Sequence, residues 1–189
     1  MPKPRTQQIS LADTPFYHIC SRTVRRAFLC GVDKESGNSY EHRRIWIEKR
    51  IFQLSQVFSI DICAHAVMHN HLHIVLCVDS DKMKTWSTED VLERWHQLFK
   101  GTLLTQKYLN KKPLNKFELG MVESAAQVYK NRLIDISWFM RSLNEPIARQ
   151  ANREDKCTGH FWEGRFKSQA LLDEGALLSC MAYVDLNPV

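Results

Sequence analysis

Two adjacent runs of residues decide the fold: Ile60-Asp-Ile-Cys-Ala-His-Ala-Val-Met68 and His71-Leu-His-Ile-Val-Leu-Cys-Val78. Both have the length of strands, and only His69 and Asn70 separate them, which suits a tight hairpin. Side chains alternate across a strand, so the apolar residues of the second run share one face: Leu72, Ile74, Leu76 and Val78. The sequence therefore predicts a β-hairpin with His71 and His73 together on the opposite face.

Further strands and helices are predicted on both sides of this hairpin. The residue patterns predict a strand at 16–22, a helix at 40–58, a helix at 134–152 and a final strand at 161–172. Pro146 is expected to kink the second of these helices. Asp173 has the side chain of an N-cap, so a last helix is predicted to begin at Glu174. The length of 189 residues fits one domain, which we assign to residues 1–189.

Residues 80–135 carry the least regular pattern and are treated as an insertion in that domain. Thr88 is predicted to cap a helix that runs to about Lys100. Residues 109–120 contain the sequence Lys-Lys-Pro-Leu-Asn-Lys and are predicted to form a loop.

The composition is that of a globular protein with a mild basic excess. Residues are 44% hydrophobic and 25% charged, the formal net charge is +5, and no apolar run is long enough to span a bilayer. The N-terminal stretch lacks the apolar run of a secretory signal, so a cytoplasmic location without membrane association is expected. The six cysteines match neither a zinc-finger spacing nor a C-x-x-C pair and are expected to be reduced and mostly buried.

Four residues are candidates for chemistry. Side chains two residues apart on one strand lie about 7 Å apart along the backbone, so His71 and His73 can converge on one metal ion. Tyr183 and Asn187 share a stripe of the last helix with Ala176 and Cys180. Taken singly, such histidines and tyrosines more often serve packing. Together they form the combination that phosphoryl transfer needs, a nucleophile beside a positive centre that stabilises phosphate charge.

The order of motifs resembles one enzyme family. Met68-His-Asn-His-Leu-His-Ile-Val-Leu76 is similar to the hairpin of the His-hydrophobe-His (HUH) nucleases, with His69 where transposases usually have proline. Further similar segments are Tyr17–Arg22, Trp138–Asn144, Gly159–Ser168 and Tyr183–Val189. This series resembles the single-tyrosine transposases of insertion sequences, especially the REP-associated tyrosine transposases. Members of that family continue beyond the last motif, whereas the sequence ends at Val189, which leaves a truncation open.

The resemblance implies an α+β, ferredoxin-like fold, in which helices pack on an antiparallel sheet and a C-terminal helix carries the tyrosine. It implies His71, His73 and Asn187 as ligands of Mg²⁺ or Mn²⁺, and Tyr183 as the nucleophile. The implied enzyme is a metal-dependent DNA transposase that cleaves and rejoins single-stranded DNA at or near hairpins. A 5′-phosphotyrosine would be its covalent intermediate.

Single-stranded or hairpin DNA is therefore the expected partner, and the sequence leaves open whether the chain acts as a monomer or a homodimer. Phosphate contacts are expected from five basic residues: Arg22, Arg25, Arg26, Arg165 and Lys167. Phe161 or Trp162 is a candidate for base stacking, against the alternative that both belong to the core. A domesticated, non-catalytic regulator that binds hairpin DNA is the main alternative function. An RNA-binding domain has less support, because residues 17–22 lack its aromatic-rich motif.

Overall fold

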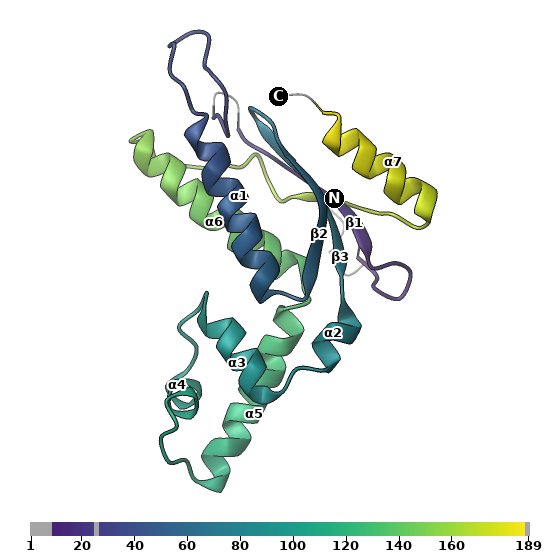
Figure 1. The fold of residues 1–189 in the computed structure, drawn as a ribbon. Coiled ribbons are helices and arrows are strands. Elements are labelled where there is room, and N and C mark those ends of the chain that lie inside the picture. The colour runs from purple at the N-terminus through teal and green to yellow at the C-terminus, as the bar shows by residue number, and fades with distance from the viewer. Residues whose placement is uncertain (1–8, 25–26, 188–189) are drawn as a thin grey trace.

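The computed structural model describes residues 9–24 and 27–187, which form an α+β fold (Figure 1). Within these residues the strands are β1 (Phe16–Arg22), β2 (Ile60–Val67), β3 (His71–Val78) and β4 (Lys167–Ala170). The helices are α1 (His42–Val57), α2 (Ser80–Lys84), α3 (Thr88–His96), α4 (Leu103–Leu109), α5 (Lys116–Arg132), α6 (Ile136–Glu154) and α7 (Glu174–Asp185).

The four strands make one antiparallel sheet in the order β2-β3-β1-β4. The predicted hairpin is β2 and β3, and the predicted first strand is β1 with the expected bounds. The final strand is shorter than predicted, because β4 covers only Lys167–Ala170. Before it, Trp162 forms an isolated bridge with Thr23, so this part of the chain follows the continuation of β1 without forming a regular strand.

The two faces of the sheet are covered by different helices. Helices α1 and α6 lie on one face and α7 lies on the other (Figure 1). The main core fills the first side, where Ile19, Leu72 and Ile74 of the sheet meet Leu54 of α1 and Phe139 of α6. A smaller apolar cluster lies under α7 and contains Ala64, Val75, Leu171 and Val184. The period-2 pattern of β3 thus separates the main core from the face that carries its histidines.

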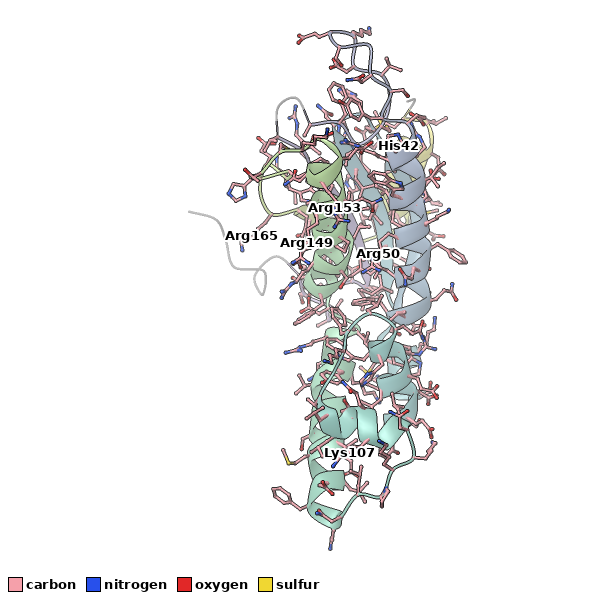
Figure 2. The ribbon with its side chains drawn as sticks, turned by 90° about the vertical axis from the view of Figure 1, so that its left-hand side faces the viewer. His42, Arg50, Lys107, Arg149, Arg153 and Arg165 are labelled. Carbon is pink, nitrogen blue, oxygen red and sulfur yellow. The ribbon has the colours of Figure 1, made fainter. Side chains whose placement is uncertain are left out.

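Two arginines of α1 join that helix to α6. The Arg50 guanidinium, labelled in Figure 2, donates a hydrogen bond from Nε to the Ser142 carbonyl at 2.9 Å. Arg43 is only 1% exposed and donates to the carboxylates of Glu154 and Asp155 and to the Phe28 carbonyl. A buried charge is tolerated only when it is paired in this way.

The segment 80–135 is mostly helical, which corrects two sequence-based predictions. Thr88 was predicted to cap a helix to about Lys100, but it is the first residue of α3, whose cap is Ser87; the Ser87 side chain accepts from the Asp90 N–H, and the helix ends at His96. The predicted loop at residues 109–120 is a loop only from residue 110, after the end of α4, to Asn115. That residue caps α5 in a reciprocal pair with Glu118, so the polar stretch that suggested a loop includes a helix start.

Helix α7 begins where the sequence predicted. The Asp173 side chain accepts a hydrogen bond from the Ala176 N–H, which satisfies one of the free donors at the helix start. Among the residues described, we find no helix with both the length and the apolar character that crossing a bilayer requires.

Candidate functional site

The two histidines of β3 lie on the sheet face that α7 covers. His71 is half-buried and His73 is 7% exposed, and their ring centroids are 4.8 Å apart with nearly perpendicular planes. Leu72 and Ile74, which alternate with them along the strand, belong to the main core on the other side. The rings are therefore neighbours at one position on the sheet.

Each of these rings has its Nδ1 atom engaged by a neighbouring side chain. Nδ1 of His71 lies 2.7 Å from Oδ1 of Asn70, and Nδ1 of His73 lies 2.8 Å from Nε2 of His18 on β1. In each ring, Nε2 is therefore the nitrogen that is left to bind a metal ion.

Tyr183 reaches the same place from α7. Its ring is edge-on to that of His73, with 5.8 Å between centroids, and the residue is 55% exposed. The helix is held by its buried neighbour Val184, which packs against Ala64 and Val75 of the sheet. Because Val184 packs against the sheet, the preceding residue, Tyr183, lies at the edge of the interface between α7 and the sheet, and its ring is accessible to solvent.

Asn187 lies just beyond the end of α7, after the C-cap residue Leu186. Its side-chain Nδ2 is buried and has no hydrogen-bond partner among the described residues. Because Nδ2 is a hydrogen-bond donor, the group that satisfies it must be an acceptor.

A cavity of about 600 Å³ joins the histidines and the tyrosine to basic side chains. It is lined by His71, His73 and Tyr183 and by three of the expected phosphate-binding residues: Arg22, Arg165 and Lys167. All three basic residues are exposed, and Arg22 has one acidic neighbour, with its Nε 3.9 Å from Oε2 of Glu163. The other two expected phosphate-binding residues, Arg25 and Arg26, lie outside the described residues.

The segment before β4 is fixed beside β1, and this places Arg165 at the cavity. The Glu163 N–H donates to the Arg22 carbonyl at 2.8 Å, and the Trp162 indole N–H donates to the Asn144 carbonyl of α6 at 2.8 Å. Phe161 is 3% exposed and belongs to the main core, and Trp162 packs against that core. The two aromatic residues thus have a structural role, and the suggestion that Phe161 stacks a base is wrong because its ring is buried.

The histidines of the site favour the neutral form. Burial, together with the nearby His18 and His71, lowers the pKa of His73 to about 4. The pKa values of His71 and His18 are also below the ordinary range, in each case mainly because of burial. A neutral imidazole has the free lone pair that a metal ligand needs.

The donors available at this site are nitrogen and amide groups. Within the described part of the chain, no group of three or more His, Cys, Asp or Glu side chains is arranged to hold a metal ion. Two imidazoles suit a divalent transition metal, and an amide or phosphate oxygen is the type of ligand that could complete the set. The unpaired atom of Asn187 is the donor Nδ2 and not the oxygen that a cation needs, and Asn187 is not among the residues that line the cavity.

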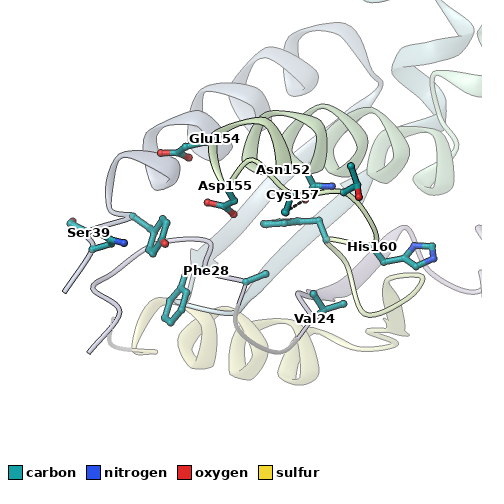
Figure 3. Close-up of a pocket in the computed structure, with 13 residues that line it drawn as sticks. Val24, Phe28, Ser39, Asn152, Glu154, Asp155, Cys157 and His160 are labelled. Atoms are coloured by element: carbon teal, nitrogen blue, oxygen red, sulfur yellow. Dashed lines mark hydrogen bonds between the residues drawn. The ribbon is translucent and has the colours of Figure 1, made fainter. Parts of the chain in front are cut away.

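Another hollow of about 710 Å³ lies between the end of α6 and the residues before α1 (Figure 3). Its carboxylates, Glu154 and Asp155, are already bound to Arg43. The carboxylates of this hollow are therefore less available to bind a ligand than the histidines of the other cavity.

The residues of the histidine site that were not predicted from the sequence include His18, Asn70 and Glu163. The alternation of β1 places His18 and Arg22 on one face of that strand, which is the available signal. The sequence does not give the register of β1 against β3. His18 lies beside His73 because Cys20 pairs with His73.

Comparison with known proteins gives a likeness of fold. No protein-family model matches the chain, and no curated protein matches it. A solved structure described as the REP-associated tyrosine transposase bound to a REP hairpin is similar, with a TM-score of 0.51 and 13% identity. The match covers 100% of this chain and 73% of the other. At this identity the likeness concerns the arrangement of strands and helices.

Proposed function

We propose that the chain is a DNA transposase of the single-tyrosine HUH class, which cleaves and rejoins single-stranded DNA at or near hairpins. The observation that carries the proposal is the convergence of His71, His73 and Tyr183 from two distant elements on one cavity with basic walls. The fold neighbour bound to a REP hairpin supports DNA as the partner. When α2 to α5 and the last helix α7 are set aside, the element order is β-α-β-β-α-β, and with the strand order β2-β3-β1-β4 this supports the finer class, a ferredoxin-like fold.

In the proposed reaction the phenolic oxygen of Tyr183 attacks the phosphorus of the scissile phosphate. The bond from phosphorus to the 3′ oxygen breaks, the tyrosine hydroxyl loses its proton, and the leaving 3′ oxygen gains one. The products are a 5′-phosphotyrosine and a free 3′-hydroxyl. Attack of another 3′-hydroxyl on the phosphotyrosine then joins strands and restores the tyrosine.

The proposed cofactor is Mg²⁺ or Mn²⁺, with His71 and His73 as ligands and Asn187 as the third. A bound divalent ion supplies the positive charge that the phosphate oxygens need as the bond is exchanged. Arg22, Arg165 and Lys167 are proposed to hold the flanking phosphates, since they line the same cavity.

The second candidate function is a non-catalytic regulator that binds hairpin DNA. The same basic residues would serve it, but it gives no reason for a half-exposed tyrosine ring beside two neutral histidines. The two functions differ in covalent chemistry.

The deciding experiment is incubation of the protein with Mn²⁺ and single-stranded hairpin DNA taken from beside its own gene. A transposase forms a protein–DNA adduct that survives denaturing electrophoresis, and mass spectrometry of the digested adduct locates it on Tyr183. Binding without any adduct, at several metal ions and hairpin sequences, would favour the regulator.

A further inference from the structure

One contact beneath the site joins two strands through their histidines. His18 on β1 reaches His73 on β3, with Nε2 of His18 2.8 Å from Nδ1 of His73. In the antiparallel register His73 is opposite Cys20, so His18 is its diagonal neighbour on the same face. The contact therefore follows from the sheet register.

The geometry is that of a hydrogen bond lying close to both ring planes. The planes are 18° from parallel, and the ring centroids are 5.0 Å apart although the two nitrogens are only 2.8 Å apart. Rings lying one over the other with nitrogens so close would have closer centroids. The two imidazoles thus meet edge to edge, the arrangement in which an N–H of one ring points at the lone pair of the other.

Only one hydrogen can occupy this bond, and its position decides what His73 can do. If His73 donates from Nδ1, its Nε2 carries a lone pair and can bind a metal ion. If His18 donates instead, neutral His73 carries its hydrogen on Nε2 and cannot bind there.

We propose that His18 is a positioning residue, which accepts the Nδ1 hydrogen of His73 and so keeps the His73 Nε2 lone pair free for the metal. This inference rests on the proposed metal site. Metal-bound histidines commonly donate their second ring N–H to a neighbouring group, which fixes both the tautomer and the ring orientation.

His71, the other histidine of β3, has a partner that can act in only one way, the side chain of Asn70. Oδ1 of Asn70 can only accept, so its 2.7 Å contact places the hydrogen of His71 on Nδ1. His18 can donate or accept, so the direction of its bond to His73 is the point that needs an experiment.

The test uses the metal-free protein labelled with ¹⁵N at histidine. Long-range ¹H–¹⁵N spectra at neutral pH distinguish the two neutral tautomers of each ring. We expect a protonated Nδ1 and an unprotonated Nε2 for both His71 and His73. An Nε2–H tautomer for His73 in the unmodified protein would overturn the proposal, and this result requires no variant.

Two variants and one control separate positioning from packing. His18→Phe keeps a ring of similar size but cannot accept a hydrogen bond, whereas His18→Gln offers an amide oxygen at about the position of Nε2. We expect His18→Phe to lose the uniform Nδ1–H tautomer of His73 and to bind Mn²⁺ about 10-fold to 100-fold more weakly. His18→Gln should retain the tautomer and most of the affinity. His65→Gln, at an exposed position of β2 outside the histidine cavity, should change neither.

The outcomes also separate this proposal from the proposed function. An unchanged tautomer and unchanged Mn²⁺ affinity in His18→Phe would remove the positioning role while leaving the metal site intact. A protein with the expected tautomers, lost in His18→Phe, supports the positioning contact even if no adduct with DNA ever forms.

Discussion

The ring of Tyr183 on α7 meets the ring of His73 on β3 edge-on, with 5.8 Å between their centroids. The first residue comes from the end of the chain and the second from its central hairpin. Packing of Val184 against Ala64 and Val75 is what holds α7 over the histidine face. The proposed nucleophile and the proposed ligands lie on different elements, so their meeting depends on that packing as much as on the residues themselves.

Replacing Tyr183 by phenylalanine should separate binding from chemistry. The ring and its contact with His73 are kept, and the hydroxyl belongs to a residue that is 55% exposed, so stability should change by less than about 0.5 kcal/mol. DNA affinity should stay within a few-fold, while adduct formation should fall to background.

Tyr108→Phe is the matched control, because this tyrosine lies on α4, away from the cavity. It should form adduct at the normal rate. An adduct on a tyrosine other than Tyr183 would show that the nucleophile has been misassigned.

The hairpin and the tyrosine helix could be predicted because each depends on local patterns. Alternation along β3 separates its histidines from Leu72 and Ile74, and the N-cap residue Asp173 marks the start of α7. The contact of His18 with His73 could not be predicted, because it depends on the register of two strands that are far apart in sequence. Sequence periodicity assigns a face to a side chain but does not assign its neighbour on that face.

The helices between β3 and α6 were difficult to predict from the sequence for a different reason. Residues 109–120 are polar and contain Pro113, which favours a loop, yet Asn115 and Glu118 form the reciprocal cap of α5. The cap is visible in the sequence, but the buried side chains of α5 are sparse, with Val122, Ala126 and Tyr129 on one face. A weak apolar stripe gives little signal for a helix whose stability comes mainly from its neighbours.

Removing either histidine of the site should end cleavage without unfolding the protein. His71→Ala or His73→Ala removes one proposed ligand, and loss of several kcal/mol of charge stabilisation lowers the rate about 100-fold or more. Both variants should still unfold cooperatively in urea, and chelation of the metal with EDTA should have the same effect on the unmodified protein. Undiminished cleavage by both variants would exclude the metal role.

The metal-free protein should become less stable as pH falls from about 6.5 towards 4. The pKa of folded His73 is about 4, below its ordinary value of 6.5, because burial and then His18 and His71 disfavour the imidazolium. Between these values the unfolded chain binds a proton that the folded chain does not, so unfolding is favoured at lower pH. The lowered pKa values of His18 and His71 act in the same direction.

Urea denaturation at several pH values measures this effect. His73→Asn removes one titrating group and should reduce the loss of stability between pH 6.5 and 4. A variant with the same pH dependence as the unmodified protein would mean that His73 titrates normally in the folded state.

Arg43 should be the most important charged residue for stability. It is 1% exposed and joins α1 to Glu154 and Asp155 at the end of α6. Arg43→Met leaves both carboxylates without this partner and should lower the free energy of unfolding by about 3 kcal/mol. Arg141→Met, which removes an exposed pair with Glu145, should cost about 0.5 kcal/mol. Equal effects of the two changes would contradict the distinction between buried and exposed pairs.

DNA binding should be largely electrostatic and should depend on the basic wall of the histidine cavity. Arg165 and Lys167 are exposed there, beside His73 and Tyr183. Each phosphate contact releases counterions, so the dissociation constant should rise steeply with salt, and the logarithmic slope should decrease by about 0.7 for each single-strand contact removed. Replacing both residues by glutamine should therefore weaken binding at low salt and flatten the salt dependence.

Lys112→Gln with Lys116→Gln is the matched control, since it removes the same charge from the exposed surface around the start of α5. Fluorescence anisotropy with a labelled hairpin, measured at four or more salt concentrations, gives the slope for each protein. The control should keep the slope of the unmodified chain, because a change in net charge alone does not remove a phosphate contact. If both double variants flattened the slope equally, general charge would account for the binding and the histidine cavity would have no special part in it.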